Sequence, residues 1–291
     1  MRRSSAGFLV GLVVGALCLA LAPAAQAAGH VAASSFNPAN FTNPTSITNP
    51  YFPLAPGKQY VYKGQADRGN GLKPHTLIIT VTGLTKVLDG VKTRVVWEQD
   101  INDGQLVESE LAFFAQDKFG TVWILGEYPE EYENGVFVGA PNAWIAGVDG
   151  ATPGIAMQAT PTTGLPPYSQ GFAPDVIDDF GQVISTTTAT CLALPVAGLP
   201  GNPRCFSNVV VVRETNTSEP GQYQDKYHAP GVGVILILPG GAAPGERLEL
   251  VQVNTLSAAA LSDANYQAYR LDRRAYAFSE AFRNTSPAQP G

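Results

Sequence analysis

The chain has 291 residues, a formal net charge of −6 at pH 7, and a charged fraction of only 14%. This acidic balance argues against a protein that binds nucleic acid or an anionic membrane surface. Glycine and proline together account for 53 residues (30 and 23). Low charge combined with many turn formers and Val/Thr/Ile-rich segments is typical of an all-β protein with many loops.

The N-terminus has the order of a secretory signal peptide. Arg2 and Arg3 precede an apolar run over residues 8–22, and a small-residue site follows at residues 25–27, so we expect cleavage after Ala27. The alternative is a membrane anchor, but the run has about 15 residues and a spanning helix needs about 20. Cleavage would change the net charge from −6 to −8, because it removes two arginines and no acid.

Cys18 raises the question of lipid attachment. A lipid-attachment motif needs a small residue directly before the cysteine, and Leu17 stands there instead. The sequence therefore predicts a secreted or periplasmic protein that is not lipidated and has no membrane span. It leaves the oligomeric state open.

Three segments follow the signal peptide, which occupies residues 1–27. Residues 28–48 are rich in Ala, Ser, Asn, Pro and Thr and predict an extended linker with little core of its own. Residues 49–254 predict a single β domain, and residues 255–291 predict a C-terminal helix with a frayed tail.

The first half of the β domain reads as a meander. Alternating apolar and polar residues predict strands at residues 58–64, 75–82, 91–98, 106–116 and 121–128. Asp-Gly or Asn-Gly pairs, which favour two-residue hairpins, stand at residues 89–90, 103–104 and 134–135. Strands joined by short turns are neighbours, so we expect an antiparallel sheet. The predicted fold class is mainly β, a curved antiparallel meander sheet or half-barrel with a C-terminal amphipathic helix.

The second half of the β domain begins with a loop. Residues 147–171 hold many glycines and prolines and predict a long irregular segment, a candidate lid. Further strands are expected at residues 182–189, 208–215, 222–228, 232–238 and 246–254.

The C-terminal segment has helical periodicity. Ser262 is a candidate N-cap, and spacings of three and four residues connect Ala264, Ala268, Leu271, Ala275, Phe278 and Phe282. Such a stripe predicts a helix packed on its own sheet. The alternative is a helix that binds a partner.

Cys191 and Cys205 are the two cysteines of the mature chain. An even pair in an oxidising compartment predicts a disulfide, and the alternative is two buried free thiols.

The familiar catalytic and metal-binding motifs are not found. No HExxH, CxxC, G-x-S-x-G, phosphate loop or complete dinucleotide fingerprint occurs. We therefore predict no catalytic residues, no metal and no cofactor, and favour a binding protein over an enzyme.

Two groups of polar residues need a separate interpretation. Glu127, Glu130, Glu131 and Glu133 lie near the 134–135 turn and predict a solvated hairpin tip, with carboxylate catalysis or weak calcium binding as alternatives. His75 is interpreted as a satisfied core or rim histidine rather than a catalytic one.

Aromatic and aliphatic residues alternate along neighbouring strands. They could line a ligand pocket on one sheet face or simply fill a core. The candidates for the pocket are Tyr62, Leu77, Ile79, Val95 and Trp97.

Four markers resemble a family of secreted bacterial β-rich proteins of unassigned function. They are the Asn49–Leu54 entry (NPYFPL), the Ala115–Glu127 segment (AQD, G, VW, GE), the Trp144–Ile155 segment (W, AG, DGA, PGI) and the Lys226–Gly233 segment (KYHAPGVG). The family more often has an aromatic residue at the position of His228. A looser similarity is to lipoprotein-carrier-like half-barrels, which wrap a curved sheet around a helix and hold acyl chains.

Three functions remain open on the sequence. The first is binding of a small apolar or amphipathic ligand, with lipid binding as a hypothesis. The second is an envelope or extracellular interaction protein with no small ligand. The third, which the missing motifs disfavour, is a carboxylate-dependent hydrolase.

Overall fold

A computed structural model describes residues 36–67, 71–241 and 245–291 of the chain. The predicted signal peptide lies outside these residues. The elements are a 3-10 helix η1 (Pro38–Asn40), an α-helix α1 (Ala258–Phe278) and fifteen strands: β1 (Lys58–Asp67), β2 (Leu72–Leu88), β3 (Val91–Asn102), β4 (Gln105–Gln116), β5 (Val122–Glu133), β6 (Val136–Gly139), β7 (Trp144–Ile145), β8 (Gly154–Met157), β9 (Tyr168–Ala173), β10 (Ile177–Cys191), β11 (Cys205–Asn216), β12 (Tyr223–Ala229), β13 (Gly233–Gly240), β14 (Arg247–Thr255) and β15 (Gln289–Pro290).

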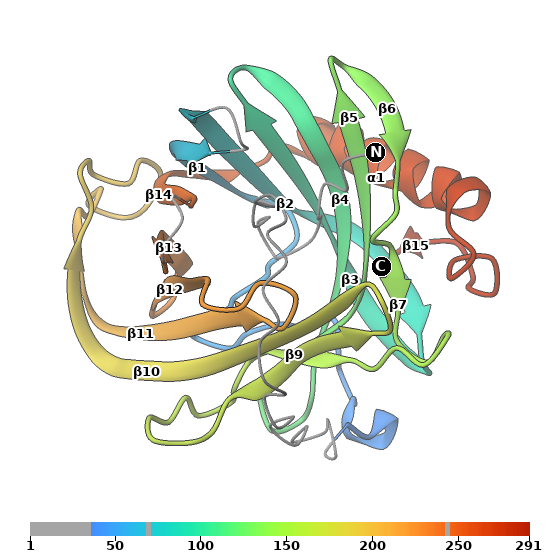
Figure 1. Ribbon diagram of the computed structural model, residues 1–291, viewed down its shortest axis with the longest axis horizontal. Coiled ribbons are helices and arrows are strands. Elements are labelled where there is room, and N and C mark those ends of the chain that lie inside the picture. Colours follow the sequence, from blue (N-terminus) through green and yellow to red (C-terminus); the bar gives the residue numbers. More distant parts are fainter. Residues whose placement is uncertain (1–35, 68–70, 242–244) are drawn as a thin grey trace, which may run out of the picture.

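The strands form one open, curved antiparallel sheet, as the sequence predicts (Figure 1). Its order is β6-β5-β4-β3-β2-β1-β14-β13-β12-β11-β10-β9. Two meanders, β1 to β6 and β9 to β14, are therefore joined by the pairing of β1 with β14. The curved sheet surrounds an interior lined by one face of each strand.

The hairpin turns explain why the first meander is so regular. Asp89, Asp103 and Asn134 have φ values of 44°, 52° and 51°, and each is followed by a glycine with positive φ. Two consecutive residues in this region make a type I′ turn, whose twist matches that of the flanking strands. The prediction of tight hairpins at these three places is confirmed.

The segment 147–171 differs from the predicted irregular loop. It contains β8, which pairs with β5, and the first residues of β9. An isolated bridge between Thr152 and Phe172 brings the two ends of the sheet together. Gly154 makes this approach possible, because a Cβ there would lie 1.9 Å from the carbonyl carbon of Gln170. The segment is thus part of the wall rather than a lid.

Helix α1 lies on the outer face of the sheet, against β2, β3 and β4 (Figure 1). Its N-cap is Ser257, whose hydroxyl accepts a hydrogen bond from the backbone N–H of Ala260, so the predicted cap at Ser262 is wrong. The helix packs on its own sheet, and it does not enter the interior as it does in the carrier-like half-barrels. The interior is therefore lined by side chains of the strands and of the loop before β1.

The apolar stripe of the helix is only partly as predicted. Ala268, Leu271 and Ala275 are buried against the sheet, whereas Phe278 is 53% exposed. Phe282 lies beyond the end of the helix and is fully buried. Its ring contacts that of Tyr128, with centroids 5.2 Å apart.

A buried ion pair fixes the helix to the sheet. The Lys86 ammonium group on β2 donates hydrogen bonds to Asp272 (2.8 Å), to the Tyr276 hydroxyl (2.9 Å) and to the Ser286 carbonyl (2.7 Å). The second carboxylate oxygen of Asp272 accepts from the backbone N–H of Ala288 at 2.9 Å. Because both charges are inaccessible to solvent, each depends on the other for its compensation.

The C-terminal tail is not frayed, contrary to expectation. Gln289 and Pro290 form β15 and pair with Thr85 and Leu84 of β2. The hydrogen bonds that Lys86 and Asp272 make to residues 286 and 288 hold the tail in place.

The described part of the predicted linker also packs on the domain. Phe36 and Phe41 contact the ring of Trp123, with centroids 5.3 and 6.5 Å apart. Ile47 is buried and bridges to Leu54. Residues 36–48 therefore contribute to the core.

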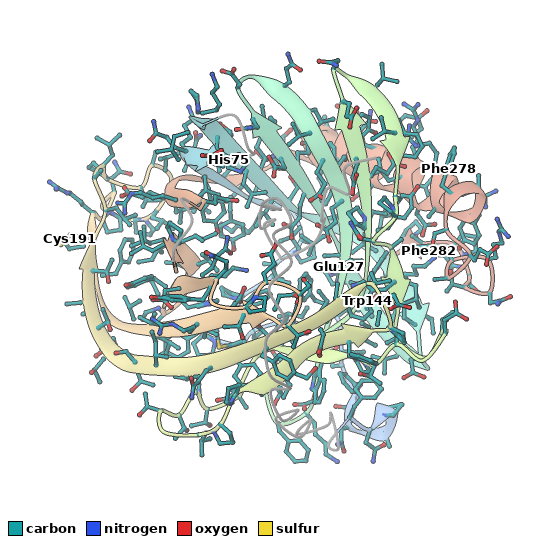
Figure 2. The ribbon with its side chains drawn as sticks, in the orientation of Figure 1. His75, Glu127, Trp144, Cys191, Phe278 and Phe282 are labelled. Carbon is teal, nitrogen blue, oxygen red and sulfur yellow. A yellow bond between two sulfur atoms is a disulfide. The ribbon has the colours of Figure 1, made fainter. Side chains whose placement is uncertain are left out.

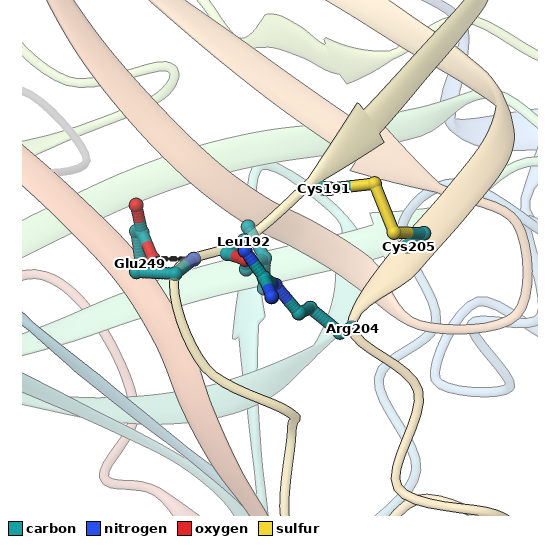
Figure 3. The surroundings of a disulfide bond; sticks show 6 residues. Cys191, Leu192, Arg204, Cys205 and Glu249 are labelled. Carbon is teal, nitrogen blue, oxygen red and sulfur yellow. Dashed lines mark hydrogen bonds between the residues drawn. A yellow bond between two sulfur atoms is a disulfide. The ribbon is translucent and has the colours of Figure 1, made fainter.

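Cys191 and Cys205 form the predicted disulfide (Figure 3). It closes the β10–β11 connection, whose residues also bind β14. Ala193 donates its backbone N–H to Glu249 at 2.7 Å, and Ala197 exchanges backbone hydrogen bonds with Val251 and Val253. The bonded loop thus reaches across β12 and β13 to the strand beyond them.

Removing the carboxylate of the buried Lys86–Asp272 ion pair is expected to lower the stability of the fold. Asp272→Asn leaves the Lys86 ammonium group buried without an anion, so the free energy of unfolding should fall by about 3–5 kcal/mol in chemical denaturation. The control is Glu280→Gln, because Glu280 makes an exposed pair with Arg283 and its loss should change stability by about 0–1 kcal/mol. A loss below about 1 kcal/mol for Asp272→Asn, within the range of an exposed pair, would contradict this assignment.

The Cys191–Cys205 disulfide is also expected to contribute to the free energy of unfolding. Thiol counting on denatured, unreduced protein that lacks residues 1–27 should find no free thiol. The double variant Cys191→Ser/Cys205→Ser should unfold with about 3 kcal/mol less free energy, since the bond closes a loop with a sequence separation of 14. Two free thiols per chain would show that the bond does not form.

Candidate ligand-binding cavity

A cavity of about 60 Å³ lies in the interior of the curved sheet. Its wall comes from the loop before β1, from β8 and from strands of both meanders, β1 to β4 and β11 to β13. Most of this wall is apolar. The apolar side chains include Phe52, Leu54, Tyr60, Tyr62, Leu77, Ile79, Phe114, Val234 and Ile237.

The structure brings together three of the five predicted pocket residues. Tyr62, Leu77 and Ile79 all line the cavity. Tyr62 is paired directly with Leu77 across β1 and β2, so both side chains point to the same face. That these residues bind a ligand stays a prediction.

Val95 and Trp97 are not among the residues that line this cavity, and their side chains point to the other face of β3. Ile79 pairs with Glu98 and not with Trp97, so the side chain of Glu98 faces the cavity. Val95 is fully buried opposite Phe113, whose ring contacts Phe282. The apolar alternation of β3 therefore belongs to the interface with the C-terminal segment.

One side of the cavity is polar. Glu98, Glu214, Lys226 and His228 contribute to its lining, and all four are buried. The Lys226 ammonium group lies 2.6 Å from a Glu214 carboxylate oxygen. The other oxygen of Glu214 accepts a hydrogen bond from the side-chain amide of Gln170 at 3.0 Å.

His228 has one satisfied and one unsatisfied ring nitrogen. Nδ1 lies 3.1 Å from the backbone carbonyl oxygen of Tyr51. Nε2 is buried and has no hydrogen-bond partner among the described residues. Burial lowers the pKa of this imidazole to about 3, so the ring is neutral at physiological pH.

More acidic groups lie behind the cavity. Glu127 accepts a hydrogen bond from the indole N–H of Trp144 at 2.8 Å, and Figure 2 shows the two side chains beside each other. Glu127 also hydrogen-bonds to Glu110. Asp179 accepts from the side-chain amide of Asn216. Glu127, Asp179 and Glu214 contribute to the lining of a smaller cavity of about 20 Å³.

Burial raises the pKa values of these carboxyl groups. Desolvation, reinforced by the charge of Glu127, raises the pKa of Glu98 to about 8 and holds that of Glu110 well above its usual range. Desolvation raises the pKa of Glu127 to about 7, although the Trp144 hydrogen bond opposes the shift. The pKa of Asp179 is raised for the same reason of burial. At neutral pH several of these groups are therefore protonated.

The interpretation of the glutamates of β5 as a solvated tip is wrong for two of them. Glu127 is 3% exposed and faces the interior, and Glu130 is fully buried on the outer face. Glu130 accepts hydrogen bonds from Tyr128 and Tyr132 and from Arg274 of α1. Their alternation on β5 places the two carboxylates on opposite faces, which makes a shared reaction centre impossible.

His75 is a buried histidine, in agreement with its interpretation. Its Nδ1 lies 3.4 Å from Asp100 and its Nε2 lies 3.5 Å from Glu246. Among residues 36–67, 71–241 and 245–291, no group of three or more His, Cys, Asp or Glu side chains is placed to hold a metal ion.

The polar side of the cavity was missed at the level of sequence. The sequence contains one indication of this polar side. Gln224, Lys226 and His228 stand at alternate positions of β12, so their side chains share a face. Their proximity to Glu214 and Glu98 depends on strand register, which the sequence does not contain.

Comparisons with known proteins give no family. No protein-family model and no curated protein matches the chain. One solved structure with a weak likeness is described as an exported protein with a YmcC-like fold from Bacteroides fragilis NCTC 9343. It is 11% identical, with a TM-score of 0.37, and the match covers 70% of this chain and 98% of that one.

A second solved structure is described as a lipoprotein from Parabacteroides distasonis ATCC 8503. It is 13% identical, with a TM-score of 0.37 and the same coverage of 70% and 98%. Likeness of this degree carries no argument about this chain, so the family resemblance noted from the sequence stays a prediction. Within the described ranges, no helix is both long and apolar enough to cross a membrane.

The raised pKa values predict how stability depends on pH. Between pH 6.5 and 8 the native state holds protons on Glu98 and Glu110 that the unfolded chain has released, so the free energy of unfolding should fall as pH rises. His228 does not oppose this trend there, because its lowered pKa affects stability only below about pH 6.5. The slope should reach about 1.4 kcal/mol per pH unit for each such proton.

Urea unfolding at several pH values measures this slope. The variant Glu98→Gln, which cannot lose a proton, should give a flatter profile than the wild type. A free energy of unfolding that is constant or rises between pH 6.5 and 8 would contradict the protonated state of the interior carboxyl groups.

Proposed function

We propose that the protein binds a small amphipathic ligand in the interior cavity. The observation that carries this proposal is the composition of the wall, which is apolar on the side of Tyr62, Leu77 and Ile79 and polar on the side of Lys226 and His228. Pockets for small molecules combine a mainly apolar lining with a few polar groups that orient the ligand.

The size of the cavity limits the ligand. A cavity of about 150 Å³ is known to hold benzene, and this one has about 60 Å³. It accepts one end of an amphiphile or a very small molecule, and a whole acyl chain would require the wall to move. Lipid binding in the sense of the carrier-like half-barrels is therefore not part of the proposal.

Two alternatives explain less of the structure. A carboxylate-dependent hydrolase needs an acid and a second carboxyl group at the substrate. The raised pKa of Glu98 suits a general acid, but the other carboxylate of the cavity, Glu214, is paired with Lys226 at 2.6 Å. An interaction protein without a ligand does not explain why a polar group is left unsatisfied in the interior.

The proposal predicts that filling the cavity removes the ligand. Native mass spectrometry of protein purified from its own host should show an adduct on the wild type that disappears after solvent extraction. Ile79→Trp should abolish the adduct, because Ile79 lines the cavity and the larger ring occupies the space.

The matched control is Trp97→Phe on the opposite face, where Trp97 donates a hydrogen bond to Ser109 at 2.9 Å. This variant should keep the adduct. Equal amounts of adduct on the Ile79→Trp protein and on the wild type would place the ligand elsewhere.

A further inference from the structure

The hydrogen-bonding state of His228 is determined by its neighbours. The backbone carbonyl oxygen of Tyr51, 3.1 Å from Nδ1, can only accept a hydrogen bond, so Nδ1 carries the proton. In a neutral imidazole the other nitrogen is then an acceptor. Burial keeps the ring neutral, since it lowers the pKa to about 3. Nε2 therefore has a free lone pair.

This lone pair is part of the cavity wall and lacks a donor within the described parts of the chain. The two tyrosine hydroxyls of the same wall are already engaged. Tyr60 donates to the carbonyl of Pro53 at 3.2 Å, and Tyr62 donates to that of Val234 at 3.0 Å. Leaving a buried acceptor unpaired costs about 1–3 kcal/mol. Since the described residues supply no donor, a water or a ligand is expected to supply it.

The charged groups around the cavity favour some ligand head groups over others. The ammonium group of Lys226 is neutralised by Glu214 at 2.6 Å. Glu98 faces the same cavity, and Glu110 and Glu127 lie behind it. An anionic head group would meet the lone pair of Nε2, and Lys226 is already paired with Glu214, so its desolvation would not be compensated.

We propose that the cavity recognises the head group of its ligand as a hydrogen-bond donor, a hydroxyl or an ammonium group, which binds Nε2 of His228, and that it rejects carboxylates. This inference rests on the function proposed above and specifies the ligand class. The donor satisfies Nε2, while the carbon chain contacts Leu77 and Ile79.

Small probes test this without knowledge of the natural ligand. Butan-1-ol and diethyl ether are isomers with the same number of heavy atoms, but only the alcohol has a donor. Butylammonium and butyrate carry the two charges. Each is titrated into the full mature protein, and binding is followed by NMR through the methyl groups of Leu77 and Ile79.

The alcohol or the ammonium probe should bind at least about tenfold more tightly than the ether and butyrate, a difference of about 1.4 kcal/mol. Whichever of the two binds more tightly identifies the head group as neutral or cationic. His228→Asn should remove the preference, because its side-chain amide can still donate to the Tyr51 carbonyl but has no acceptor at the position of Nε2.

The outcomes separate the two proposals. Equal binding of alcohol and ether, tighter binding of butyrate, or a preference that survives in His228→Asn would each overturn the donor inference and leave a cavity that binds ligands. If no probe shifts the methyl resonances of the wild-type protein, both the cavity function and the inference fail. The wild-type titrations decide the question even if the variant does not fold.

Discussion

The burial of β2, β3 and β4 on both faces is the constraint on which the rest of the structure depends. Their outer face is covered by α1 and the C-terminal segment, which are fastened by the pair of Lys86 and Asp272. Because the helix is on the outside, the inner face is covered by side chains of the opposite strands and of the loop before β1. The two meanders do not fill this space completely, and the cavity is what remains.

The interior of the sheet brings several carboxyl groups together, which proteins usually keep apart. Glu98, Glu110 and Glu127 face inward from three adjacent strands, and Glu98 is directly opposite Glu110 in the ladder. Like charges at this position repel each other, and the chain reduces the repulsion by retaining protons. Lys226 supplies a positive charge at one side only. The interior therefore holds the ion pair of Lys226 with Glu214 beside the protonated carboxyl groups of Glu98 and Glu110.

Sequence reasoning identified the strands, the hairpins and the disulfide because each depends on local chemistry. Asp-Gly and Asn-Gly pairs adopt positive φ values readily, and alternation shows that a strand has two different faces. It does not show which buried face adjoins a cavity. Val95 and Trp97 alternate like the other candidate pocket residues, but Val95 is buried in the core under the C-terminal segment.

Two features that the sequence did not predict, the burial of Glu127 and the docking of the C-terminal tail, depend on contacts between residues far apart in the chain. The burial of Glu127 requires Trp144 as a donor seventeen residues away. The position of the tail depends on a lysine 186 residues before Asp272. Neither partner can be identified from periodicity, because periodicity reports on neighbours along one element only.

The pairing of β1 with β14 also has a consequence for the way the chain reaches its native state. Each meander is built from neighbouring strands and needs only short loops to close. The contact between Lys58 and Thr255 spans 197 residues, and it forms only after nearly the whole chain has emerged. Closing such a long loop is entropically expensive and slow. Until then, the edge of β1 that later binds β14 is unpaired. Such an unpaired strand edge can pair with another copy of the chain.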